Sequence, residues 1–323
     1  MNENNEDKVI KKLMKKDFNK LGLALVMNEL VLNVVVFIII IGTMIIQMIN
    51  NPNMGEDQFM QILDNASFNG IMSIIASFIA FIPILIYRRK KFLQYDLVVE
   101  NKKFTIKIVI IGFIILFSMN ATLGVFVEGL EFLLNGVGLT ARGALEDLEI
   151  LNQPSIVMVL STCIVGPIFE EFVYRGVVLR TLEKYGRWFA ILVSSILFGL
   201  MHGNFYQIFM AVGIGIILGY LTTEYSIKIA IILHICNNTM VQLLSEINAR
   251  VSGNIVDVIN ISLTAASIII VIITFVRNKS YIKSWLESNR FEKKITLRFF
   301  TSITIIIIVA FNLYMVITGI TKI

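Results

Sequence analysis

The sequence predicts an all-α protein, a polytopic bundle of about eight or nine transmembrane helices. Hydrophobic residues make up 56% of the 323 residues and charged residues only 16%. Soluble domains have about 45–50% apolar and about 25% charged residues. The apolar residues also gather in long runs, as helices that cross the ~30 Å hydrocarbon core of a bilayer require. This composition excludes a soluble globular enzyme, a disordered protein and a collagen-like fibre.

Nine apolar segments are expected to form the spans, since a helix satisfies all its backbone groups internally. They cover residues 21–49, 68–87, 106–127, 154–179, 188–201, 205–221, 229–244, 255–276 and 299–319. A span needs about 20 residues, so the fifth segment is too short to cross alone and the next two are marginal. If the fifth and sixth segments form a re-entrant pair, the count becomes eight.

Lysine and arginine predict the orientation of the chain. With the N-terminus in the cytoplasm and alternating sides, 24 of the 28 cationic residues fall on the cytoplasmic side. Only Arg142, Arg250 and Lys322 fall on the opposite side. Because positive residues favour cytoplasmic loops, this orientation is expected. The net charge of +5 is thus explained by membrane topology. The lipid bilayer is an expected partner and nucleic acid is not.

One integral membrane domain is expected, because four prolines and scattered glycines leave little linker material. Residues 1–20 are predicted to form a basic cytoplasmic segment, and residues 21–323 the membrane domain. The connection 130–154 is expected on the outer side. It mixes Glu131, Glu146, Asp147 and Glu149 with leucines, a pattern typical of an interfacial amphipathic helix.

The fourth apolar segment contains three ionisable residues, Glu170, Glu171 and Arg175. Each costs at least about 2.5–3.5 kcal/mol on insertion scales, so each needs a structural or chemical reason. Glu171 and Arg175 are four residues apart and share one helix face, which favours an ion pair that supports the helix. Glu170 points about 100° away. It is therefore predicted to be an unpaired carboxylate that faces a cavity.

Both histidines of the chain, His202 and His234, lie in or at the end of apolar segments. A histidine in a membrane is often a hydrogen-bonded packing residue, but two beside a free carboxylate favour a functional site. Phe198 and His202 are four residues apart, as are His234 and Asn238, so each pair shares a helix face. An imidazole and an amide on one face can orient a water molecule or donate to an oxyanion.

Other polar residues in the spans are expected to be structural. Glu29 lies near the cytoplasmic end of the first segment, where its carboxylate is expected to reach the interface. Asn120, Glu128, Asn237 and Gln242 are expected to form hydrogen bonds between helices.

The motifs Glu-Glu-x-x-x-Arg, Phe-x-x-x-His and His-x-x-x-Asn follow one another on separate predicted spans, at Glu170, Glu171 and Arg175, then Phe198 and His202, then His234 and Asn238. In this order they resemble the CAAX-protease and bacteriocin-processing family of intramembrane endopeptidases, also called the Abi family. The resemblance covers residues 154–245, the expected peptidase-like core. It implies an α-helical membrane peptidase fold. It also implies cleavage near a prenylated C-terminus in eukaryotic members, and peptide processing or bacteriocin self-immunity in bacterial ones.

This resemblance implies an intramembrane endopeptidase that acts on a membrane-associated protein or peptide. The site is expected to open towards the cytoplasmic half of a bacterial plasma membrane. Without a metal, Glu170 is the general base, His202 helps to hold the water, and His234 and Asn238 stabilise the oxyanion. In a second version, Glu170, His202 and His234 bind a zinc ion, since two histidines and a carboxylate are an accepted catalytic set. The residues allow both versions.

Two other classes of function stay open. The first is a non-catalytic bacteriocin-immunity or peptide-binding membrane protein, in which the polar cluster holds a peptide. The second is a proton-coupled transporter, in which buried glutamate and histidine relay protons. No internal repeat is visible in the sequence, which weighs against a transporter built from inverted repeats.

Overall fold

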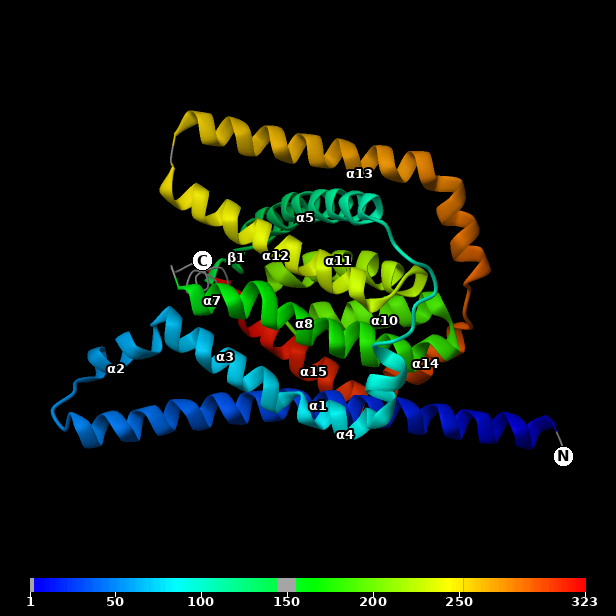
Figure 1. Ribbon diagram of the computed structural model, residues 1–323, viewed down its shortest axis with the longest axis horizontal. Helices are drawn as coiled ribbons and strands as arrows, with labels where there is room; N and C mark the ends of the chain where they lie inside the picture. The colour runs from blue at the N-terminus through cyan, green and yellow to red at the C-terminus, as the bar shows by residue number, and fades with distance from the viewer. Residues whose placement is uncertain (1–2, 144–154, 252) are drawn as a thin grey trace.

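The computed structural model describes residues 3–143, 155–251 and 253–323, which form a bundle of helices running side by side (Figure 1). In these residues, seven helices are long and apolar enough to cross a membrane, and an eighth span results if the bent pair α14 and α15 is counted as one. The all-α polytopic fold is therefore confirmed. The count of seven or eight meets the lower end of the predicted eight or nine, because the fifth predicted segment is a helix of only 14 residues.

The chain begins with five helices and a π-helical turn. They are α1 (Glu3–Asn50), α2 (Glu56–Leu63), α3 (Ala66–Ala80), α4 (Ile82–Arg88), the π-helical turn Phe92–Asp96, and α5 (Ile106–Asn135). Helix α1 continues unbroken through residue 20, so the expected basic segment and the start of the membrane domain share one helix. Helices α3 and α4 separate at Phe81, close to Pro83, which lacks the backbone N–H that would continue the helix.

The fourth apolar segment is a helical rod with two π-helical turns. It comprises α7 (Ile156–Leu160), the π-turn η3 (Ser161–Val165), α8 (Gly166–Glu171), the π-turn η4 (Phe172–Leu179), α9 (Arg180–Leu182) and the 3₁₀ turn η5 (Glu183–Tyr185). Such π-turns are rare and often mark functional sites. Here they flank α8, the short helix that carries the two adjacent glutamates.

The remaining helices complete the bundle. They are α10 (Arg187–Leu200), α11 (Phe205–Glu224), α12 (Ile227–Arg250), α13 (Asn254–Ser288), α14 (Lys293–Phe300) and α15 (Ile303–Thr318). Figure 1 shows α8, α10, α11 and α12 in the middle, with α1 along one side and α13 along the other. Two short strands, β1 (Leu139–Thr140) and β2 (Thr321–Lys322), pair antiparallel near the C-terminus.

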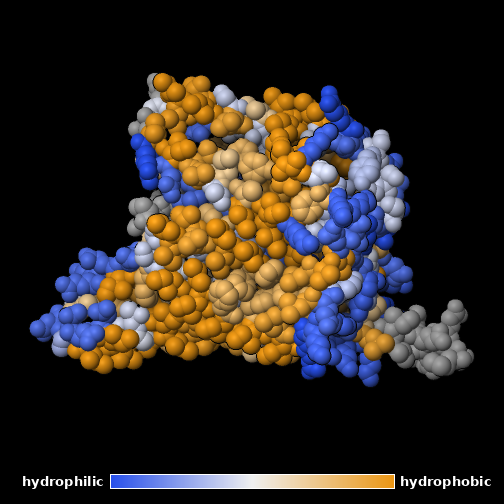
Figure 2. Space-filling view, viewed as in Figure 1, coloured by the Kyte–Doolittle hydropathy of each residue, from blue (hydrophilic) through white to orange (hydrophobic). Residues whose placement is uncertain are grey.

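The surface matches a protein embedded in lipid. Figure 2 shows a broad hydrophobic band across the middle of the molecule and hydrophilic residues gathered towards the ends of the helices. Large apolar side chains such as Phe37, Ile255 and Phe275 are more than half exposed. An apolar surface of this extent is covered by lipid in a membrane protein.

The cations assigned to the cytoplasm meet at one end of the bundle, which we call the cation-rich end. There Glu224, the last residue of α11, contacts Lys102 at 2.7 Å and Arg187 at 2.9 Å. Arg88 pairs with the buried Asp96 at the same end. The contacts of Glu224 join α11 to the start of α10 and to the connection that precedes α5. The cytoplasmic location of this end stays a prediction.

Two expectations change in this frame. Glu29 does not reach the interface: its carboxyl group hydrogen-bonds to Asn312 of α15, and one of its oxygens is buried without a partner. Glu29 therefore belongs to the contact between α1 and α15. Of the expected outer connection 130–154, residues 144–154 lie outside the described residues, while Glu131 ends up in α5 and accepts a hydrogen bond from Thr140.

Gly70 allows α3 to touch the rod that carries the glutamates. A methyl group at this position would lie 2.7 Å from the backbone nitrogen of Met158, whereas one at Gly124 meets nothing within 4 Å. We predict that Gly70→Ala lowers the free energy of unfolding by about 1–3 kcal/mol. Gly124→Ala should raise it by about 0.5–1 kcal/mol through helix propensity. Thermal unfolding in detergent measures both, and equal effects would contradict the close packing.

Candidate active site

The predicted site residues line one cavity of about 560 Å³ within the bundle. Glu170 comes from α8, Phe198 and His202 from the end of α10, and His234 and Asn238 from α12. Three motifs separated by up to 68 positions thus converge, as the sequence predicted. Glu170 keeps 24% of its side chain exposed, so its carboxylate is accessible from the cavity.

Glu171 and Arg175 lie behind the cavity wall, both fully buried. Arg175 Nη1 lies 2.9 Å from Glu171 Oε1, which confirms the predicted pair. The same oxygen lies 2.9 Å from Nδ1 of His234. Because a carboxylate only accepts hydrogen bonds, Nδ1 carries the proton and donates. Glu171 therefore also orients the imidazole of His234, a contact that the sequence motif did not reveal.

His234 points its other nitrogen towards the second glutamate. Its Nε2 lies 3.6 Å from Oε2 of Glu170. The two adjacent glutamates thus hold opposite sides of one imidazole ring. Glu171 is completely buried and paired, while Glu170 faces the cavity. The surroundings of Glu171 therefore suit a carboxylate that holds the imidazole in place, and those of Glu170 suit one that exchanges a proton.

Phe198 explains why a phenylalanine precedes His202 by one helical turn. Its ring contacts the rings of His202 and His234 edge-on, with centroids 5.0 and 5.7 Å apart. The guanidinium of Arg175 lies 4.2 Å from the Phe198 ring centre, where the ring's π electrons attract a cation. The backbone carbonyl of Phe198 accepts from Nδ1 of His202 at 2.9 Å. Phe198 therefore fixes both imidazoles against the buried ion pair.

Asn238 hydrogen-bonds a backbone carbonyl that has no partner within its own helix. In the π-turn η3, Gly166 donates its N–H to the carbonyl of Ser161. The carbonyl of Thr162 would then require the N–H of Pro167, which does not exist. Nδ2 of Asn238 donates to that carbonyl instead, at 3.1 Å. This bond ties α12 to the glutamate rod and leaves Asn238 one further N–H.

Metal binding by the candidate ligands stays a prediction. Among the described residues, no group of three or more His, Cys, Asp and Glu side chains is placed to hold a metal ion. Glu170, His202 and His234 nevertheless line the same cavity. His234 also directs one nitrogen to Glu171 and His202 directs one to a backbone carbonyl.

Nine of the 20 residues that line the cavity are neutral polar residues that the motifs did not identify. These are Ser73, Ser77, Asn120, Ser161, Thr162, Gln207, Asn237, Gln242 and Ser245. The expectation that Gln242 bonds another helix is wrong for its amide nitrogen, which is buried with no partner. A signal was present in the sequence: His234, Asn238, Gln242 and Ser245 follow at intervals of four, four and three, so one face of α12 is polar along its length.

The cavity extends away from the cation-rich end. Helix α12 starts there at Ile227, and its lining residues run from His234 to Ser245. Helix α11 runs the opposite way and lines the cavity with its first half, from Gln207 to Ile214. The expectation that the site opens towards the cytoplasmic half is therefore wrong for an orientation with the cation-rich end in the cytoplasm.

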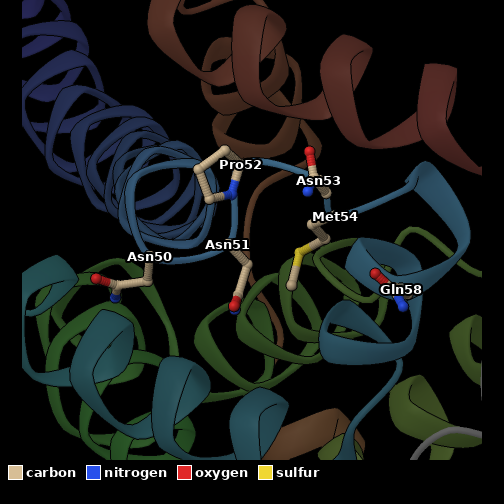
Figure 3. Close-up of a pocket in the computed structure, with 6 residues that line it drawn as sticks. All are labelled: Asn50, Asn51, Pro52, Asn53, Met54 and Gln58. Atoms are coloured by element: carbon tan, nitrogen blue, oxygen red, sulfur yellow. The ribbon is translucent and has the colours of Figure 1, made fainter.

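A second hollow, of about 520 Å³, lies at the turn between α1 and α2 (Figure 3). It is lined by Asn50, Asn51, Pro52, Asn53, Met54 and Gln58. None of these side chains is a general acid, base or nucleophile at neutral pH. Of these two hollows, only the cavity at Glu170 carries groups suited to catalysis.

Comparison with known proteins points to the same segment. Residues 152–240 match a family model described as Rce1-like, type II CAAX prenyl endopeptidase Rce1-like. All seven predicted site residues lie inside this match. The resemblance to the CAAX-protease family is confirmed for this segment. The match therefore supports, at the level of the family, an intramembrane protease of the CAAX type.

One curated relative extends the comparison. It is named "Putative membrane peptidase YdiL", from Bacillus subtilis (strain 168), and is 28% identical over 131 residues. The aligned region covers 40% of this chain and 51% of that protein, so the chain spans about half the length of the curated relative that it matches. No solved structure matches the chain.

The two adjacent glutamates should differ sharply in their effect on stability. Glu171→Gln leaves the buried cation of Arg175 without a counter-charge, so we predict a loss of about 3 kcal/mol in the free energy of unfolding. Glu170→Gln is the matched control and should change it little, because this carboxylate faces the cavity. Thermal unfolding of both variants in detergent tests this. Equal unfolding temperatures would contradict the assigned division of roles.

Proposed function

We propose that the protein is an intramembrane endopeptidase that hydrolyses a peptide bond in a membrane-associated protein or peptide. The observation that carries the proposal is the convergence of Glu170, His202, His234 and Asn238 on one polar cavity inside an apolar bundle. The Rce1-like match over the same residues supports it. We place the protein in a bacterial plasma membrane, with the N-terminus in the cytoplasm, on the distribution of its cations.

In the proposed reaction, Glu170 is the general base. A water molecule in the cavity gives its proton to the Glu170 carboxylate as its oxygen attacks the carbonyl carbon of the substrate. Nε2 of His202 helps to hold this water, because its Nδ1 is occupied by the Phe198 carbonyl. Glu170 then passes the proton to the departing amine, and the bond between carbon and nitrogen breaks.

The oxyanion formed by this attack needs hydrogen-bond donors. Asn238 provides the N–H that is not used by the Thr162 carbonyl. His234 donates from Nε2 when that nitrogen carries a proton, while Nδ1 stays hydrogen-bonded to Glu171. A carboxylate that orients and supports an imidazolium in this way is a recurring catalytic arrangement. We infer a metal-free reaction, since no three His, Cys, Asp or Glu side chains among the described residues are grouped to hold a metal ion.

Replacing the general base should abolish cleavage while the protein stays folded. We predict that Glu170→Gln lowers kcat/KM by about 10²–10⁴-fold. Glu128→Gln removes a carboxylate outside the cavity and should cleave normally. The assay uses purified protein in liposomes and a library of quenched fluorescent peptides. Equal cleavage by the Glu170 variant would remove the base assignment, and no cleavage by wild-type protein would favour an immunity or peptide-binding role.

Metal removal separates the two versions of the mechanism. We predict that protein stripped by a chelator, with its metal content measured by mass spectrometry, keeps its full kcat/KM. The physical reason is that His202 and His234 act through hydrogen bonds rather than as ligands. Activity that is lost on stripping and restored by one equivalent of zinc would contradict this and support binding by Glu170, His202 and His234.

A further inference from the structure

Gln242 holds an unexplained hydrogen-bond donor in the wall of the cavity. Its side chain is 9% exposed, and Nε2 is buried with no partner. An unsatisfied buried donor costs about 1–3 kcal/mol, so such a group in a folded protein needs an explanation. The residue lies two helical turns beyond His234 on α12 and lines the same cavity.

Asn237 supplies the complementary acceptor. Its side chain is 3% exposed, and Oδ1 is buried without a partner. Its amide nitrogen is occupied by Oδ1 of Asn238, at 3.4 Å. One helix therefore presents an unpaired donor and an unpaired acceptor to a cavity that also contains the candidate catalytic groups. A ligand that carries both a donor and an acceptor would satisfy both groups at once.

The chemistry of the wall indicates what that ligand is. Beyond Glu170 and the two histidines, the lining residues have neutral side chains, many with hydroxyl or amide groups. A charged ligand would meet no counter-charge from them. The backbone of an extended peptide fits, because each residue offers one N–H and one C=O.

The length of α12 sets the register. Gln242 lies eight residues beyond His234, which is about 12 Å along the helix axis. An extended chain advances about 3.3 Å per residue, so Gln242 would meet a substrate about three or four residues from the bond that is cut. Asn237, about 4.5 Å beyond His234 by the same rise, would meet it about one or two residues away.

We propose that Gln242 and Asn237 are positioning residues that hydrogen-bond the backbone of an extended peptide substrate lying along α12. The peptide occupies the part of the cavity that leads away from the cation-rich end. This inference rests on the proposed endopeptidase function and deepens it. The substrate class is a stretch of unfolded, uncharged polypeptide of at least about four residues on one side of the cut bond.

The test compares substrate lengths in wild-type and Gln242→Met protein. Met keeps the unbranched shape of Gln and removes both polar atoms, and Gln94→Met, at an exposed position, is the control. The probe is a quenched decapeptide that wild-type protein cleaves in liposomes, beside versions shortened to two residues on either side of the cut. Wild-type protein should favour the long peptide, through KM, by about 3–10-fold, as one hydrogen bond allows.

In the Gln242→Met protein this preference for the long peptide should vanish, with kcat for the short peptide unchanged. A merely structural role would slow both peptides equally. Asn237→Leu should weaken binding of the long and short peptides alike, because its contact lies nearer to the cut bond. If Asn237→Leu does not fold, the Gln242 variant decides.

The outcomes distinguish the roles of Gln242 and Asn237 from the proposed endopeptidase function. Cleavage by Gln242→Met protein with the wild-type length preference overturns this inference and leaves the endopeptidase function standing. No cleavage of any peptide by wild-type protein overturns the function, and this inference with it. A loss of length preference in the Gln94→Met control would also overturn the assignment to Gln242.

Discussion

The carboxylate of Glu171 is the group on which the site depends. It is completely buried inside an apolar bundle, where an ionised group must be paired. One of its oxygens contacts both Arg175 and His234 at 2.9 Å. Arg175 in turn lies against the Phe198 ring, which contacts both histidine rings. A single buried charge therefore fixes the relative positions of α8, α10 and α12.

Interruptions of the regular helix geometry provide polar groups at the site. Pro167 removes a backbone donor, and the π-turn η3 leaves the Thr162 carbonyl to Asn238. A second π-turn begins directly after Glu171. A regular helix would satisfy all its carbonyls internally and offer α12 no such attachment. The polar groups of the cavity thus arise where the regular backbone pattern is broken, which is where membrane proteins place irregular backbone.

The sequence predicted the fold class and the convergence of three motifs, because apolar run length and helical spacing are local properties. The Glu171–Arg175 pair followed from a spacing of four residues. The contact of Glu171 with His234 did not, since it joins residues 63 positions apart. The direction of the cavity was also missed. His202 follows the short α10, so it lies about 22 Å from the first residue of that helix. The site therefore lies at the end of α10 that carries His202, away from the cation-rich end.

The roles of the neutral polar residues were likewise beyond the sequence. Whether an amide in a span bonds another helix or faces a cavity depends on what packs opposite it. Asn238 bonds a carbonyl, while Gln242 on the same face bonds nothing through its nitrogen. Helices α3 and α5 add Ser73, Ser77 and Asn120 to the wall, although no motif occurs in them. Packing alone brought these residues to the site.

The central claim is that this cavity adds water to a peptide bond. The most direct measurement is mass spectrometry of peptides incubated with protein in liposomes, in water enriched in heavy oxygen. The account predicts a new C-terminal carboxylate that carries one heavy oxygen atom, formed by wild-type protein and not by the Glu170→Gln variant. Peptides that stay intact with folded wild-type protein, or labelled products formed equally by the variant, would contradict it.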